Sequence, residues 1–193
     1  MITHVEKPAP KTRQRIVDAA LELFVAQGIA ATTTRDIAGR AGIAEGTIYR
    51  HFESKEALAQ EIFLEGYMPF AKALTAFERA GGTLLERLER IVDYFYSLFD
   101  LDQTRWVYLM TWQTGPQSKL PDDTPTPSRL MLKMLKESLK KGEVKGLEPK
   151  LTAEILLGII LQPADGVVYG QIAGPLRPRT AEVMQAIRKV LTP

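Results

Sequence analysis

Apolar residues recur every three or four positions along most of the chain, as they do on the buried face of a helix. No run alternates apolar and polar positions in the way that a half-buried strand would. The pattern therefore predicts an all-α protein of about nine helices. The predicted helices cover about 12–27, 33–41, 45–51, 54–67, 83–99, 104–114, 130–139, 151–173 and 179–191.

Residues that start and stop helices mark the borders of the elements near the amino terminus. Gly28 follows the first apolar stripe and is expected to end that helix, and Gly42 is expected to form a tight turn after the next one. Thr33 and Asp36 have the spacing of a capping box, and Ser54 is placed to cap a later helix. These signals predict three short helices followed by a long one.

Helix length divides the chain into two predicted domains. Residues 1–53 would form an amino-terminal arm and a three-helix helix-turn-helix domain, and residues 54–193 a linking helix joined to a larger helical bundle. A stretch rich in proline at 115–127 predicts a loop. Pro163 is expected to interrupt or kink the helix at 151–173, because a proline ring removes a backbone hydrogen bond.

Composition narrows the class of protein. The hydrophobic share of 45% and the charged share of 25% are ordinary for a soluble globular chain. The absence of cysteine excludes disulfides, thiolate metal sites and cysteine nucleophiles. No catalytic constellation can be assembled with two histidines, so we expect no enzyme, no metal and no cofactor. No apolar run is long enough to span a membrane, and we expect a cytoplasmic protein.

The positive charge is concentrated in the first quarter of the chain. Residues 1–55 carry eight Lys and Arg against six Asp and Glu, which accounts for the whole net charge of +2. This bias suits a polyanion partner and a solvated basic face about equally. We expect Lys7, Lys11, Arg13 and Arg15 to lie in a solvated arm, which could add phosphate or minor-groove contacts.

Two short helices joined by a glycine turn and braced by a longer first helix are the sequence pattern of a helix-turn-helix. In this motif the second short helix presents side chains to the major groove of DNA. Ile43, Ile48 and Phe52 have the spacing to point inward. The positions left for the outer faces are Ala44, Glu45, Thr47, Tyr49, Arg50 and His51.

The stretch 15–58 resembles the DNA-binding domain of TetR-type (TetR/AcrR) transcriptional regulators. The run T-x-Y-x-H-F-x-x-K that marks this family is present from Thr47 to Lys55. The resemblance is dense in the first third of the chain, whereas in the rest only the number and length of the helices agree. It implies a helix-turn-helix domain joined to a helical domain that binds a ligand and forms a dimer.

The resemblance also implies roles for individual side chains. Contacts to the sugar-phosphate backbone are implied for Thr34, Thr47, Tyr49, His51 and Lys55. Arg50 is the candidate for reading a base, because a guanidinium can pair with O6 and N7 of guanine. Gly46 lets the helix lie close to the groove, and Ala44 suits a thymine methyl group.

Three residues of this segment have other possible roles. Glu45 would repel phosphates, so it could accept from a cytosine amine, pair with an arginine, or favour the positive end of its own helix. Tyr49 could be a half-buried ring that seals the small domain. His51, taken without its neighbours, would be an ordinary surface or core histidine.

Aromatic residues and methionines are frequent on the apolar stripes after residue 54. Such residues most often form the core, but the resemblance implies that some of them line an effector cavity. The candidates are Phe63, Tyr67, Phe70, Tyr94, Phe95, Phe99, Leu109, Trp112, Met131 and Met134. Few ionisable groups share these stripes, so the expected effector is neutral or mostly apolar.

The last two helices carry patterns that suit a dimer interface, which the resemblance places on the last two long helices of each subunit. The candidates are Gly166, Gly170, Gly174, Val183, Ile187 and Val190. The three glycines recur every fourth residue and would clear a ridge for a second helix, although they could equally serve packing within the chain.

Together these features predict a ligand-responsive transcriptional regulator, with repression expected over activation. It would bind a palindromic DNA site as a homodimer and leave it when a small effector binds. One alternative is a protein of helix-turn-helix shape that has lost DNA binding and acts through protein partners. The other is a helical enzyme, for which His51 with Glu45 or Glu53 would be the only candidate acid-base pair.

Overall fold

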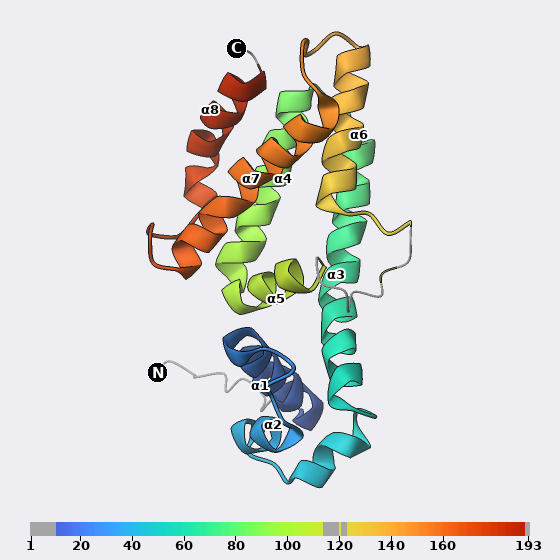
Figure 1. The fold of residues 1–193 in the computed structure, drawn as a ribbon, viewed down its shortest axis with the longest axis vertical. Helices are drawn as coiled ribbons and strands as arrows, with labels where there is room; N and C mark the ends of the chain where they lie inside the picture. The colour runs from blue at the N-terminus through green and yellow to red at the C-terminus, as the bar shows by residue number, and fades with distance from the viewer. Residues whose placement is uncertain (1–10, 114–119, 121–122, 192–193) are drawn as a thin grey trace, which may run out of the picture. The chain divides into compact units, whose positions relative to one another are not determined.

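The computed structural model describes residues 11–113, 120 and 123–191. Every regular element over these residues is a helix, which confirms the predicted all-α class. The elements are α1 (Thr12–Gln27), α2 (Thr34–Ala41), the 3₁₀-helix η1 (Glu45–Arg50), α3 (Lys55–Arg79), α4 (Leu84–Leu101), α5 (Gln103–Gln113), α6 (Pro127–Lys140), α7 (Pro149–Val168), the 3₁₀-helix η2 (Arg177–Arg179) and α8 (Thr180–Leu191) (Figure 1).

The chain divides into two compact units. Unit 1 holds the described residues up to Gly66 and those from Val107 to the end of α5, and unit 2 holds Tyr67–Trp106 and the described residues from position 120 onward. Two helices, α3 and α5, therefore contribute to both units. The domain border after residue 53 stays a prediction, because α3 is shared and no linker separates the units there.

The short helices of unit 1 begin and end at the residues that the sequence predicts. The Thr33 hydroxyl accepts from the Asp36 N–H at 3.1 Å, and the Asp36 carboxylate accepts from the Thr33 N–H at 2.9 Å. This capping box starts α2. Gly28 ends α1 with φ 83° and Gly42 ends α2 with φ 64°, angles that glycine adopts without a steric penalty.

Unit 2 is built around α4, which contacts α6, α7 and α8 (Figure 1). Leu88, Phe95 and Phe99 share the buried face of α4, as the apolar stripe predicts. Arg87 is also buried, and its Nη1 donates to Glu137 Oε2 of α6 at 3.2 Å. The core of this unit is therefore aromatic and aliphatic, with an ion pair that joins α4 to α6.

Two predictions for the carboxy-terminal helices are wrong. The helix α7 ends at Val168 and not near residue 173, because the chain turns at Gly170 with φ 68°. Gly166, Gly170 and Gly174 therefore do not form a ridge along one helix. Pro163 does not interrupt α7, which continues through it, and a kink at this residue stays a prediction.

Other elements differ from the prediction in length or type. The linking helix α3 continues to Arg79, well beyond Tyr67. The second short helix is a 3₁₀-helix, a form common in short pieces. Most of the loop predicted at 115–127 lies outside the described residues.

Candidate nucleic-acid interface

The turn between α2 and η1 is held by α1. The Arg15 guanidinium donates from Nη2 to the carbonyls of Ala41 at 2.5 Å and Gly42 at 3.1 Å. A Cβ atom at Gly42 would lie 3.0 Å from Arg15 Nη2, so both the φ angle and the space favour glycine. The prediction that Arg15 lies in a solvated arm is therefore wrong. Lys11 is exposed, and Lys7 lies outside the described residues.

Apolar side chains anchor η1 to the rest of unit 1. Ile48 and Phe52 are buried, as predicted. The Arg13 guanidinium lies 5.3 Å from the centre of the Phe52 ring and donates to Glu61 and, at 2.7 Å, to Glu65. The hydrogen bonds to Glu65 and Glu61 raise the pKa of Arg13. Arg13 thus joins α1 to Phe52 and to α3 and, like Arg15, is not part of a solvated arm.

The outer face of this helix is polar and accessible. The Tyr49 side chain is 56% exposed, so it does not act as a half-buried seal of the small domain. Thr34 and Thr47 are partly exposed. The exposed residues are Ala44, Glu45, Gly46, Tyr49, Arg50 and His51. The core does not need these side chains, and they are accessible to a partner.

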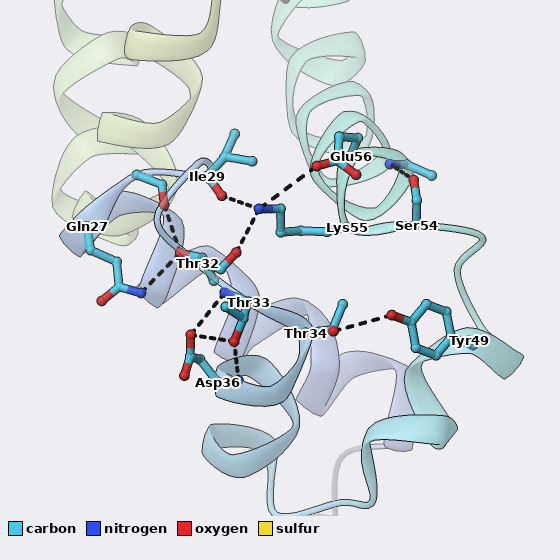
Figure 2. Close-up of polar contacts among 12 residues, drawn as sticks. Gln27, Ile29, Thr32, Thr33, Thr34, Asp36, Tyr49, Ser54, Lys55 and Glu56 are labelled. Atoms are coloured by element: carbon cyan, nitrogen blue, oxygen red, sulfur yellow. Dashed lines mark hydrogen bonds and ion pairs between the residues drawn. The ribbon is translucent and has the colours of Figure 1, made fainter.

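Thr34, Glu45 and Tyr49 form a polar cluster on this face. The Thr34 hydroxyl donates to Glu45 Oε1 at 2.6 Å. The same hydroxyl oxygen lies 3.3 Å from the Tyr49 hydroxyl (Figure 2). Sequence reasoning missed Thr34 as the partner of Glu45, because the two residues are separated by eleven positions and meet only through the turn after α2.

Arg50 and His51 are both accessible, and Arg50 is bonded to a side chain of η1. Arg50 Nη2 donates to Thr47 Oγ1 at 3.1 Å, which steadies the guanidinium. A guanidinium has five N–H donors, so most remain for a base edge. The His51 ring lies beside the Phe52 ring, with ring centres 6.4 Å apart. His51 is therefore a surface histidine and not a core one.

Lys55 differs from the other predicted backbone contacts, because its side chain is largely buried and its ammonium is bonded to main-chain carbonyls. Nζ donates to the carbonyls of Ile29 and Thr32, each at 2.7 Å, and lies 3.9 Å from Glu56 Oε1 (Figure 2). The side chain is only 17% exposed. Ser54 caps the same helix end, as predicted. Lys55 thus ties the start of α3 to the segment between α1 and α2, a role that residue type alone did not indicate.

The residues predicted to line an effector cavity are divided between the units, and nearly all are buried. Unit 1 holds Phe63, Leu109 and Trp112, and unit 2 holds Tyr67, Phe70, Tyr94, Phe95, Phe99, Met131 and Met134. Ring centres lie 5.6 Å apart for Phe63 and Trp112, and 5.3 Å apart for Phe70 and Phe95. These distances are those of packed aromatic cores, so a role in a cavity stays a prediction.

Some buried polar atoms among the aromatic residues were not predicted. The Tyr67 hydroxyl donates to the Pro125 carbonyl at 3.1 Å, and burial raises the pKa of Tyr67 to about 12. The Tyr96 hydroxyl and the Trp112 indole N–H are buried without a hydrogen-bond partner among the described residues. Burial also raises the pKa of Tyr96 to about 12. Such atoms are uncommon in folded proteins, where buried polar groups are normally bonded.

The residues predicted for a dimer interface differ in exposure. Gly166 and Ile187 are buried within the chain, Val183 and Val190 are partly exposed, and Gly170 and Gly174 are exposed. Ile187 is 0% exposed and belongs to the core of unit 2. Its place in an interface is therefore not supported.

Large apolar side chains are exposed on α7 and the turn after it, which sequence reasoning missed. They are Leu151, Ile155, Val168, Tyr169 and Ile172. By length and composition α7 could also cross a membrane, but this is weak evidence, since core helices of soluble proteins pass the same test. The exposed apolar face is the feature that needs an explanation.

The amino-terminal third of the chain matches known regulators. Residues 16–62 match the model of bacterial regulatory proteins of the tetR family. Over 61 residues the chain is 46% identical to the HTH-type transcriptional regulator SrpR of Pseudomonas putida, an alignment that covers 32% of this chain and 29% of that protein. The residues from Thr34 to Lys55 that were predicted to contact DNA lie within the segment that matches the family model.

A weaker likeness extends over most of the chain. Over 159 residues it is 28% identical to the HTH-type transcriptional repressor KstR2 of Mycolicibacterium smegmatis, covering 80% of this chain and 76% of that protein. The structure of the transcriptional regulator FadR from Bacillus subtilis in complex with stearoyl-CoA matches with a TM-score of 0.66 at 21% identity, covering 93% of this chain and 97% of that one. The likeness to the FadR structure shows a shared fold.

Proposed function

The chain belongs to the TetR family of bacterial regulatory proteins, and we propose that it is a ligand-responsive transcriptional repressor that binds a palindromic DNA operator as a homodimer. The observation that carries this proposal is the exposed polar face of η1, which follows a helix-turn-helix turn held by Arg15. In such a motif this face enters the major groove. The relatives are transcriptional regulators, so the proposed role is regulation in the cytoplasm and not catalysis.

The proposed DNA contacts follow from the chemistry of each exposed side chain. Hydroxyl and imidazole groups of Thr34, Thr47, Tyr49 and His51 donate to phosphate oxygens, and Lys55 adds a positive charge from a fixed position. Arg50 pairs with a guanine, and Ala44 and Gly46 allow close approach to the groove. Thr47 also orients Arg50, because the bond between their side chains limits where the guanidinium points.

The exposed apolar residues of α7 support a homodimer. Leu151 is 62% and Ile155 is 44% exposed, and both lie on a helix of the larger unit. Burial of apolar surface is favourable by about 25 cal/mol per Å². A second copy that covers this face, together with the partly exposed Val183 and Val190 of α8, removes that surface from water. A two-fold symmetric protein then matches a palindromic site.

The proposed effector is small and mostly apolar. The aromatic residues and methionines of unit 2 offer apolar surface, and its described core contains few ionisable groups. FadR from Bacillus subtilis binds stearoyl-CoA, whose acyl chain is apolar. The buried Tyr96 hydroxyl has no hydrogen-bond partner among the residues that the structure describes, so it would bond one polar atom of an effector within unit 2.

The route from effector to DNA that we propose is α3. This helix is continuous from Lys55 in unit 1 to Arg79 in unit 2. An effector that displaces the second half of α3 also moves Lys55, which is bonded to the segment before α2. Half-sites must be spaced by about 34–36 Å or a multiple of it, so a small change in the separation of the two η1 helices lowers affinity.

Selection of bound duplexes from a random-sequence pool tests the function. We expect an enriched palindrome with half-sites about one helical turn apart. Arg50→Ala should weaken discrimination at one base pair by about 1–3 kcal/mol. Arg179→Ala removes the same charge from an exposed ion pair in unit 2 and should select the wild-type sequence. A pool with no enriched sequence would contradict the proposed function.

A further inference from the structure

Glu45 is the one acidic residue in the row of exposed side chains on η1, and its carboxylate already has a partner. The Thr34 hydroxyl donates to Glu45 Oε1 at 2.6 Å. A hydroxyl has a single proton to donate. While this bond stands, the Thr34 proton is therefore not available to a phosphate oxygen.

A carboxylate and a phosphate compete for such a proton on equal terms. Hydrogen bonds from a hydroxyl to an anionic oxygen measure about 2.5–2.7 Å, and the bond between Thr34 and Glu45 falls in this range. The Thr34 hydroxyl has one proton, so a phosphate oxygen that accepts it replaces Glu45 Oε1 as the acceptor. Glu45 therefore loses this bond when the phosphate binds.

The Tyr49 hydroxyl belongs to the same arrangement. It lies 3.3 Å from the Thr34 hydroxyl oxygen, and because the Thr34 proton is given to Glu45, the Tyr49 hydroxyl is the donor in this contact (Figure 2). One hydroxyl proposed to hold the DNA backbone is thus bonded to Glu45, and a second one is bonded to the first. Glu45 is exposed, so its side chain can rotate away without unpacking the core.

From this geometry we infer that Glu45 is an internal competitor of DNA phosphates for the proton of the Thr34 hydroxyl, and that it lowers the affinity of the protein for DNA of any sequence. The inference rests on the proposed function and assigns Glu45 a role in it. Because a genome offers a vast excess of non-specific sites, weaker sequence-independent binding leaves more of the protein for its operator.

Binding of the full chain to a random-sequence duplex, measured by fluorescence anisotropy between 50 and 200 mM salt, tests this inference. Glu45→Gln should bind about tenfold more tightly at 50 mM salt for each subunit on DNA, because the Thr34 proton becomes available to a phosphate oxygen. In a Thr34→Val background the same substitution should change affinity less than about threefold, because the shared proton is gone. Circular dichroism checks that each variant is folded.

Glu53→Gln is the matched control, since it removes one negative charge from an exposed side chain of the same unit. If Glu45→Gln gains no more than this control, or binds more weakly than the wild type, the inference is wrong while the proposed function stands. An equal gain in the Thr34→Val background would also overturn it, because the effect would then be one of general charge. If neither the wild type nor any variant binds duplex DNA, the proposed function itself fails.

Discussion

The two units of the chain place tyrosine side chains in different surroundings. In unit 1 the Tyr49 ring is 56% exposed and its hydroxyl joins a polar cluster at the surface, whereas in unit 2 Tyr96 is 1% exposed and packs into an aromatic core. A surface tyrosine that the core does not need indicates a partner outside the chain. The Tyr96 ring packs in the core, and its hydroxyl has no hydrogen-bond partner among the described residues, so the function of unit 2 is less directly visible than that of unit 1.

The largest expected effect is a loss of stability in the aromatic core of unit 2. Phe95 is 1% exposed, and its ring centre lies 5.3 Å from that of Phe70. Phe95→Ala should lower the free energy of unfolding of unit 2 by about 3–5 kcal/mol, through lost burial and a cavity. Urea unfolding followed by Trp106 fluorescence in a Trp112→Phe background reports on this unit, because Trp106 is then the sole tryptophan.

Tyr49→Ala is the counterpart for Phe95→Ala at the surface of unit 1. Since more than half of the ring is exposed, its removal should change the unfolding free energy by no more than about 0.5 kcal/mol. Equal destabilisation by the two substitutions would show that Tyr49 is part of the core, which would contradict the contrast drawn between the units.

A smaller effect is expected at Lys55, a side chain that we propose both to contact DNA and to stabilise unit 1. Lys55→Met leaves the Ile29 and Thr32 carbonyls without their charged donor, and it should destabilise unit 1 by about 2 kcal/mol. Trp112 fluorescence in a Trp106→Phe background reports on unit 1. Lys133→Met, which breaks an exposed ion pair with Glu78, should cost much less than Lys55→Met. Wild-type stability of Lys55→Met would contradict the positioning role.

The smallest expected effect is a change in carboxyl pKa, which differs between the capping boxes of the two units. The Thr33 hydroxyl is the main cause that lowers the pKa of Asp36 below its ordinary value of 3.8, whereas the backbone N–H of Thr83 is the main cause that lowers the pKa of Glu86. Thr33→Ala should therefore raise the pKa of Asp36 more than Thr83→Ala raises that of Glu86. Carboxyl titration by NMR measures both shifts, and equal shifts would contradict the assignment.

The same caps give a pH dependence with a defined sign. A carboxylate whose pKa is lowered on folding stabilises the native state above its ordinary pKa, and this contribution is lost as pH falls through the folded value. Thr33→Ala should cost about 1 kcal/mol at neutral pH. That difference from the wild type should shrink below pH 3.8, and a difference independent of pH would contradict a role for the Asp36 carboxylate.

The sequence predicted unit 1 well because its signals are local. Gly28, Gly42 and the box of Thr33 and Asp36 each set a helix border through backbone geometry or a bond three residues away. The bond of Glu45 to Thr34 could not be predicted in this way, since it depends on the turn that brings them together. The bonds of Lys55 to main-chain carbonyls were missed because every residue carries a carbonyl.

The later helices were predicted less accurately because a glycine can either lie within a helix or turn the chain at its end. Three glycines at a spacing of four suit a ridge on a helix, but Gly170 instead adopts a positive φ that turns the chain. The stripe on α8 was predicted correctly as apolar, yet Ile187 faces the core and not a partner. Periodicity identifies an apolar face, but it does not say whether that face packs within the chain or on a second copy.

Binding to a random-sequence duplex over a salt series most directly tests whether the exposed face of η1 binds the DNA backbone. A protein with six to ten phosphate contacts loses about 10³–10⁵-fold in affinity between 50 and 200 mM salt. We expect such a loss for the wild type, and weaker binding at every salt concentration for a variant that combines Thr47→Val, Tyr49→Phe and His51→Ala, because these side chains would donate hydrogen bonds to phosphates. Absence of binding at 50 mM salt, or a variant with the wild-type affinity, would contradict the assignment of this face to DNA.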